Sequence, residues 1–231
     1  MMNLIEGDDG SVLVVAAHAD DEVLGCGGTI ARFAAIGRRV HIMFMTDGIS
    51  ARQEGDSEAR MQAAKEAAAT LGAESPRFGD FPDNAMDSIP LIDVARAVET
   101  VVNEIKPSLV LTHHHGDLNV DHEIVNRAVM TACRPQPGFC VESILAFSIR
   151  SSTEWAIPSI ENIFEPDVFV GIELHLSKKL KALNCYSMEM REAPHTRSIE
   201  AVEMEAKLLG ARVGMHAAEG FKLLRMLVRD E

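Results

Sequence analysis

The segment Ser11–Glu22, which reads SVLVVAAHADDE, joins a valine-rich apolar run to one imidazole and three acidic side chains. A short apolar run of this kind is typical of a strand that is buried on both faces of a parallel sheet. In such sheets the functional groups gather just beyond the carboxyl ends of the strands, where the loops open onto a crevice. The segment therefore predicts the first strand of an α/β fold and a polar site at its end.

The rest of the chain alternates further strand and helix patterns. Apolar runs bounded by polar or turn-forming residues predict four more strands, at Val40–Thr46, Ser108–Thr112, Ser143–Ile149 and Asp167–Ile172. Apolar spacing of three and four residues predicts helices over 61–71 and 91–105, and later over His175–Met190 and Ser198–Leu209. Parallel neighbours need a crossover connection, usually a helix, so this order predicts a Rossmann-like three-layer sandwich with a mainly parallel sheet.

Length and composition limit the class of protein. The chain has 231 residues, of which 47% are apolar and 25% charged, and we interpret 1–231 as a single globular domain. The net charge of −13 would repel a phosphate backbone, which argues against a nucleic-acid partner. The cysteines lack framework spacing, the N-terminal stretch does not resemble a signal peptide, and no run reaches about 18 apolar residues. These features predict a cytoplasmic protein without a membrane span.

The residue types after the first and third predicted strands favour a metal site. Catalytic zinc takes three protein ligands from histidine and carboxylate and leaves one position open. His18 and Asp21 can supply two of these ligands, and the segment His113–His122, which follows the third strand, can supply the third. Asp20 would then remain as a carboxylate that takes a proton from water. The pattern predicts metal-assisted hydrolysis with zinc, although another divalent ion such as Fe²⁺ suits the same ligands.

These motifs resemble those of a known family, the LmbE-like or PIG-L deacetylases, whose signatures are an Ala-His-Pro-Asp-Asp-Glu turn and a later Asp-His pair. The turn is present at Ala17–Glu22, with Ala19 in place of the proline, and the pair is intact at Asp121–His122. Further similarity lies at Thr46–Gly48, Gly79–Asn84 and Pro194–Ser198. The resemblance therefore covers most of the chain.

The resemblance implies an activity and assigns roles to four residues. His18, Asp21 and His122 are expected to hold zinc, and Asp20 is expected to be the general base. The implied reaction is removal of the acetyl group from an N-acetylglucosamine-type sugar or sugar conjugate, which gives a free amine and acetate. Relatives often assemble, so a homo-oligomer is also expected.

Other site residues are less strongly indicated by the sequence. Family members often carry a histidine three positions before the ligand histidine, where this chain has Asn119. The oxyanion donor or general acid is therefore sought among Asn119, His115 and His195, and an amide cannot deliver a proton at neutral pH. Four charged residues in or near loops after strands are candidates to bind sugar hydroxyls or to support the metal ligands: Asp47, Arg52, Arg60 and Asp83.

Two functions from other classes use the same sequence features. A non-haem iron oxygenase also uses two histidines and one carboxylate, but we expect such enzymes on all-β barrels. A nucleotide-binding module without catalysis would use a glycine-rich turn such as Gly25–Gly28. That turn lacks the Gly-x-Gly-x-x-Gly spacing, and close packing of the helix against the sheet is the preferred interpretation.

Overall fold

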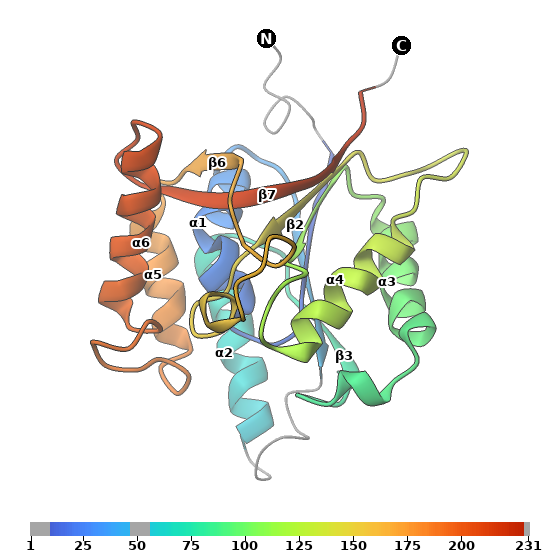
Figure 1. Ribbon diagram of the computed structural model, residues 1–231, viewed down its shortest axis with the longest axis horizontal. Coiled ribbons are helices and arrows are strands. Elements are labelled where there is room, and N and C mark those ends of the chain that lie inside the picture. The colour runs from blue at the N-terminus through green and yellow to red at the C-terminus, as the bar shows by residue number, and fades with distance from the viewer. Residues whose placement is uncertain (1–9, 47–55, 229–231) are drawn as a thin grey trace.

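The computed structural model describes residues 10–46 and 56–228, whose strands form one seven-stranded sheet between two layers of helices (Figure 1). The strands are β1 (Val12–Ala16), β2 (Val40–Thr46), β3 (Arg77–Phe81), β4 (Leu109–His113), β5 (Ser143–Phe147), β6 (Val168–Gly171) and β7 (Ala218–Met226). The α-helices are α1 (Asp21–Ala35), α2 (Asp56–Leu71), α3 (Leu91–Ile105), α4 (Val120–Ala132), α5 (Leu176–Cys185) and α6 (Ile199–Arg212). Within these ranges no helix combines the length and apolar character needed to cross a membrane.

The order of the strands places a crevice at the middle of the sheet. The order is β3-β2-β1-β4-β5-β7-β6, in which β1 to β5 run parallel and β7 is antiparallel to both of its neighbours. The prediction of a three-layer sandwich with a mainly parallel sheet is confirmed. After β1 the chain turns outward to β2, whereas after β4 it turns to β5 on the opposite side. Ligand sites of open α/β sheets lie at such a switch point.

The two faces of the sheet explain the apolar run that opens the fold. In β1 the side chains alternate between two cores: Val12 and Val14 pack in one, and Leu13 and Val15 pack in the other. Helices α1, α2, α5 and α6 cover the first face, and α3 and α4 cover the second (Figure 1). Because both faces are covered, the strand is apolar at every position and not only at alternate ones.

Two strands, β3 and β7, are missing from the sequence prediction, because charged residues interrupt their apolar pattern. In β7 the charge at Glu219 lies inside the protein, where it is neutralised by Lys179 at 2.6 Å. In β3 the backbone passes so close to β2 that a Cβ atom at Gly79 would lie 2.3 Å from the Met45 carbonyl oxygen. The residues that these two strands contact, Lys179 and Met45, are far from them in sequence, so neither strand shows a local signal.

The glycine-rich turn in α1 serves packing and already holds an anionic group. The helix is interrupted at Cys26, and the N–H groups that follow, those of Gly28 and Thr29, donate to the Glu219 carboxylate at 2.9 and 2.7 Å. A Cβ atom at Gly25 would lie 2.4 Å from the ring of Phe147. The position that a phosphate would take in a nucleotide-binding turn is thus filled by a side chain of the protein.

Candidate active site

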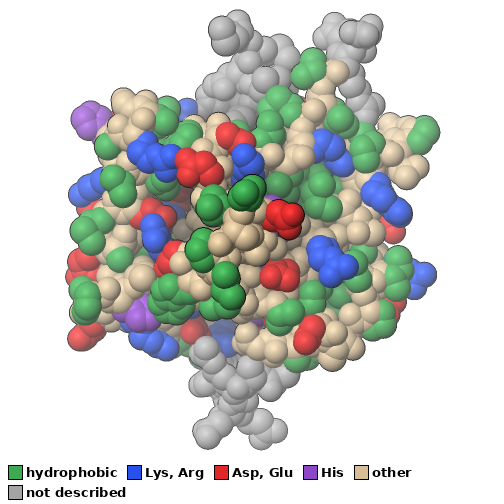
Figure 2. Space-filling view, in the orientation of Figure 1, with side chains coloured by type: hydrophobic (Ala, Val, Ile, Leu, Met, Phe, Trp, Pro, Cys, Tyr) green, Lys and Arg blue, Asp and Glu red, His purple; other side chains and the backbone are tan. Residues whose placement is uncertain are grey.

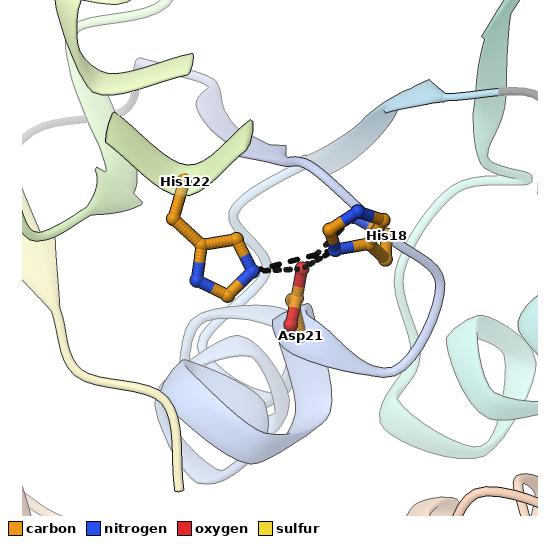
Figure 3. A group of neighbouring side chains, drawn as sticks. All are labelled: His18, Asp21 and His122. Atoms are coloured by element: carbon orange, nitrogen blue, oxygen red, sulfur yellow. Dashed lines mark hydrogen bonds and ion pairs between the residues drawn. The ribbon is translucent and has the colours of Figure 1, made fainter. Parts of the chain in front are cut away.

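Three side chains from two distant segments meet at the switch point of the sheet. His18 and Asp21 lie at the junction of β1 and α1, and His122 lies in the first turn of α4 (Figure 3). His18 Nδ1 lies 3.3 Å from both Asp21 Oδ2 and His122 Nε2. The Asp21 and His122 atoms are also 3.3 Å apart. The structure therefore brings together the three residues that the family resemblance implies as metal ligands.

The spacing of these three atoms fits a tetrahedral zinc ion. Zinc binds imidazole nitrogen and carboxylate oxygen at about 2.0–2.2 Å, and tetrahedral geometry then separates the ligand atoms by about 3.3–3.6 Å. The observed separations of 3.3 Å match this range. The donor set fits as well, because two imidazoles and one carboxylate leave a fourth position for water or substrate.

The opposite nitrogen of His18 contacts two further carboxylates. Its Nε2 lies 3.0 Å from Asp121 Oδ2 and 3.1 Å from Asp83 Oδ1, and these three residues form a second group that can hold a metal. Asp121, however, also accepts hydrogen bonds from the backbone N–H groups of Asn84 and Met86. We favour the first group, because carboxylates on the far nitrogen typically orient an imidazole that binds metal through the near one.

His122 is oriented in the same way. Its Nδ1 lies 3.1 Å from Asp117 Oδ1, and Asp117 accepts hydrogen bonds from the hydroxyl groups of Ser152 and Thr153. Burial raises the pKa of Asp117, but His122 and the two hydroxyls outweigh it and hold the pKa below its usual range. Sequence reasoning missed Asp117, although it lies in the segment after β4 that supplies His122.

Neighbouring carboxylates also raise the pKa of the two imidazoles among the candidate ligands. Burial lowers the pKa of His18, but hydrogen bonds to Asp121 and Asp21, among others, outweigh it and raise the pKa well above its usual value. Burial likewise lowers the pKa of His122, yet Asp21 and Asp117 raise it to about 9. The metal-free protein thus holds protons where a cation would bind, and metal binding would release them.

A further buried imidazole, His113, packs against the site through its ring. Its Nε2 accepts a hydrogen bond from the Ala17 backbone N–H at 2.8 Å, and its ring stacks on His122 with the centroids 3.9 Å apart. Burial lowers the pKa of His113 well below its usual value. The neutral ring of His113 therefore fixes the position of His122. The Nε2 atom of His113 is already bound by the backbone.

Asp20 lies beside the three candidate ligands on a strained backbone. Its φ of 115° falls in the left-handed region that favours glycine. Its N–H donates to Glu22 Oε2 at 3.1 Å, and its carboxylate accepts from Arg197 Nη1 at 2.9 Å. Burial raises the pKa of Asp20 to about 7, against the lowering effect of Arg197. A carboxyl group with this pKa can both take and return a proton near neutral pH.

Glu22, for which the sequence suggests no chemical role, supports Asp20. Its Oε1 accepts a hydrogen bond from the Tyr186 hydroxyl at 2.7 Å, while Oε2 holds the Asp20 N–H. Burial raises the pKa of Glu22 to about 8, with the Tyr186 hydrogen bond acting in the opposite direction. The side chain thus ties the strained turn before α1 to the segment after α5.

The three candidate ligands and Asp20 line a polar cavity of about 180 Å³. Asp83 and Asn119, which are predicted from the sequence as site residues, lie in its wall. Asn119 caps α4, since its Oδ1 accepts the Asp121 N–H at 2.9 Å, and its Nδ2 donates to Asn84 Oδ1 at 3.1 Å. The wall also contains Arg60, which the sequence indicated, and four residues that sequence reasoning missed as site residues: Ser151, Ser152, Glu189 and Arg197.

The two imidazoles considered as general acid do not line this cavity. His115 is exposed, and its Nε2 lies 2.7 Å from a backbone carbonyl of the segment between β5 and β6. His195 accepts the Arg197 N–H on Nδ1 at 3.0 Å, and its ring meets that of Trp155 edge-on. Two other residues predicted to bind substrate lie outside the described residues: Asp47 and Arg52.

A larger cavity of about 340 Å³ lies between α6 and the segment that joins β5 to β6. Apolar side chains gather over the middle of the face shown in Figure 2, and this segment contributes exposed isoleucines at Ile157, Ile160 and Ile163. The charged Arg150 in its wall is paired with Glu205. None of the candidate metal ligands lines this cavity, whereas all three line the smaller, polar one.

Comparison with known proteins identifies the family. Residues 13–133 match the model of the PIG-L family, which is described as GlcNAc-PI de-N-acetylase. The chain belongs to the PIG-L family. The matched region contains β1 from Leu13 onward, β2 to β4, the helices α1 and α4, and all three candidate ligands. The family resemblance expected from the sequence is confirmed.

Curated relatives of this PIG-L chain are named deacetylases. A 1D-myo-inositol 2-acetamido-2-deoxy-alpha-D-glucopyranoside deacetylase of Rhodococcus erythropolis is 27% identical, over 79% of this chain and 82% of its own. An uncharacterized deacetylase of Escherichia coli is 32% identical, over 74% and 88%. A probable N-acetyl-alpha-D-glucosaminyl L-malate deacetylase of Bacillus cereus is 28% identical, over 80% and 88%. Together they confirm the prediction of an enzyme that hydrolyses an amide.

Solved structures show how widely the PIG-L fold is used. The conserved protein TT1542 of Thermus thermophilus superposes with a TM-score of 0.78 at 25% identity, over 96% of this chain and 97% of that one. The hydratase GalB of Pseudomonas putida, named for 4-carboxy-2-hydroxymuconate, superposes with a TM-score of 0.76 at 24% identity, over 96% and 99%. Since a hydratase shares the fold, the reaction has to be argued from the side chains of the site.

Proposed function

We propose that this chain is a zinc-dependent deacetylase that hydrolyses the acetamide of an N-acetylglucosamine-type sugar or sugar conjugate. The observation that carries the proposal is the triangle formed by His18 Nδ1, Asp21 Oδ2 and His122 Nε2, with Asp20 beside it. The deacetylase names of the curated relatives support the same reaction.

The proposed metal ligands are His18, Asp21 and His122. Zinc bound by these residues would supply a Lewis acid that acidifies water and polarises a carbonyl oxygen. The surrounding carboxylates fit that role, because Asp121 faces the far nitrogen of His18 and Asp117 faces that of His122. Such contacts fix the tautomer of each ring and raise its basicity as a ligand.

Asp20 is the proposed general base and then the general acid. It would take the proton of the attacking water as the C–O bond forms, and return it to the amine nitrogen as the C–N bond breaks. Arg197, bound to Asp20 at 2.9 Å, keeps the carboxylate in place and favours its charged form. In the metal-free protein burial raises the pKa of Asp20 to about 7, and a bound dication would lower it and favour the carboxylate that takes the first proton.

Asn119 is the proposed hydrogen-bond donor to the oxyanion. Its amide lines the cavity, and its position is fixed because its oxygen caps α4. Only one of the two amide hydrogens is needed for the hydrogen bond to Asn84, since the group carries two donors. His115 and His195, which lie outside the cavity wall, have no step in this proposal.

The proposed substrate is a small hydroxylated molecule. The cavity is lined mainly by polar groups, and Asp83, Ser151 and Ser152 offer partners for sugar hydroxyls. Asp47 and Arg52 stay as sequence predictions for the same role.

The four cysteines are free, and on that ground we propose a reducing, cytoplasmic location.

Acetate release tests the proposal. Zinc-loaded protein is incubated with a panel of N-acetylglucosamine derivatives, and Asp20→Asn serves as the variant with an intact ligand set. We expect acetate from the wild type and a loss of kcat of about 10²- to 10⁴-fold in Asp20→Asn, which removes the proton acceptor. Oxygen consumption without acetate release would instead favour the iron oxygenase.

A further inference from the structure

The Arg60–Glu189 pair forms one side of the catalytic cavity. Arg60 comes from α2, and Glu189 comes from the segment between α5 and α6. Arg60 Nη2 lies 2.5 Å from Glu189 Oε1, and Arg60 Nη1 lies 3.8 Å from Asp83 Oδ2. Asp83 in turn contacts His18, so the pair lies one carboxylate away from the proposed metal ligands. Both members of the pair are largely buried.

The second guanidinium group of the cavity is also held by a carboxylate. Arg197 Nη1 binds Asp20 at 2.9 Å, and its Nε donates to Ser151 Oγ at 2.9 Å. Among the described residues of the wall, both arginines are thus bound by acidic side chains of the protein itself. An anionic group on a substrate would have to share a guanidinium group with one of these carboxylates.

The charges in the cavity favour a neutral ligand. Two arginines face four carboxylates, Asp20, Asp21, Asp83 and Glu189, so that a divalent cation would bring the described wall close to neutrality. A substrate carboxylate placed beside Arg60 would also lie beside Glu189 and Asp83, and like charges brought together in a binding site repel each other. Neutral hydroxyl groups, in contrast, can donate to the same carboxylates.

We infer that Glu189 sets the specificity of the enzyme for N-acetylglucosamine conjugates whose aglycone is neutral and hydroxylated, by neutralising Arg60. The inference rests on the proposed deacetylase function. The names of the relatives contain both kinds of aglycone, a neutral inositol in one and an acidic L-malate in the other. Without the Glu189 charge, Arg60 would present a guanidinium fork, which is well suited to bind a carboxylate.

A pair of substrates that share the acetamido sugar tests this inference. The N-acetylglucosamine glycosides of inositol and of malate are compared by kcat/KM for acetate release. For the wild type we expect a preference for the inositol conjugate of at least about tenfold. In Glu189→Gln the preference should fall by about tenfold, because the malate carboxylates can now bind Arg60. Effects of the substitution on Asp20 or on the metal affect both substrates and cancel in the ratio.

The matched control removes an ion pair of the same kind outside this cavity. Glu205→Gln breaks the pair with Arg150 and should leave the substrate preference unchanged. An unaltered preference in folded Glu189→Gln would overturn the inference. The ratio of kcat/KM for the two conjugates is also a test in the wild type alone. Equal turnover of the two conjugates would overturn the inference while leaving the deacetylase function intact. Acetate from neither conjugate would count against the proposed function itself.

Discussion

Replacement of Glu219 should strongly destabilise the fold, because this carboxylate is buried and has four hydrogen-bond donors around it. The carboxylate accepts hydrogen bonds from the N–H groups of Gly28 and Thr29, from the Thr29 hydroxyl and from Lys179 Nζ. Both Glu219 and Lys179 are less than 5% exposed, at 3% and 4%. In Glu219→Ala the ammonium group stays buried with one remaining partner, the Leu24 carbonyl oxygen.

The expected size of the effect follows from these contacts. Removal of one partner of a buried ion pair typically costs about 3–5 kcal/mol, because the other charge is left without compensation. For a chain of this length, such a loss corresponds to a decrease in Tm of roughly 6–20 °C. The measurement is urea unfolding at neutral pH, with thermal unfolding alongside it.

A matched control uses an exposed ion pair in the same layer of helices. Glu203 and Lys207 pair on the surface of α6 at 2.6 Å, and Glu203→Ala should change the free energy of unfolding by less than about 0.5 kcal/mol. A loss below about 1 kcal/mol in Glu219→Ala would refute the reasoning, since surface pairs reach that value. The double variant Lys179→Met/Glu219→Leu removes both charges and should recover only the part of the loss that comes from the uncompensated ammonium group, because the N–H groups of Gly28 and Thr29 still lack their acceptor.

Three further predictions concern the metal and the packing of α1. Asp117→Asn should weaken zinc binding by about 10- to 100-fold, because it removes the carboxylate that contacts the far nitrogen of His122. Competition with a chelator measures the affinity. The exposed variant Asp87→Asn is the control, and its zinc affinity should be unchanged. Gly25→Ala should lower the free energy of unfolding by about 1–3 kcal/mol, because the added Cβ would lie 2.4 Å from Phe147; an unchanged urea midpoint would contradict this. Zinc at 100 times its Kd should raise the free energy of unfolding of metal-free protein by about 2.7 kcal/mol, and an unshifted Tm would exclude tight binding to the folded state.

The sequence predicted the central part of the fold and of the site because their signals are local. The apolar run of β1 leads directly into His18, Asp20 and Asp21, so the strand, the turn and two proposed ligands are read from one segment. The third proposed ligand, His122, follows β4 at the start of a helix. The parallel order then brings the two segments to the same edge of the sheet.

The remaining features depend on contacts between distant residues and leave little trace in the local pattern. Glu219 looks like a surface residue until Lys179 and the interrupted helix α1 are placed around it. Arg197 and Glu189 lie far in sequence from the segments of His18 and His122, and they reach the cavity because α5 packs against α1 and α2 while α6 packs against α5. Likewise, the direction in which His115 points follows from the segment after β5, which the sequence shows only as a loop.

Anomalous diffraction at the zinc edge, from crystals of the zinc-loaded protein, would locate the metal. We expect one strong peak within bonding distance of His18 Nδ1, Asp21 Oδ2 and His122 Nε2. A peak on the other side of His18, between Asp83 and Asp121, would contradict it, as would the absence of any peak near His122.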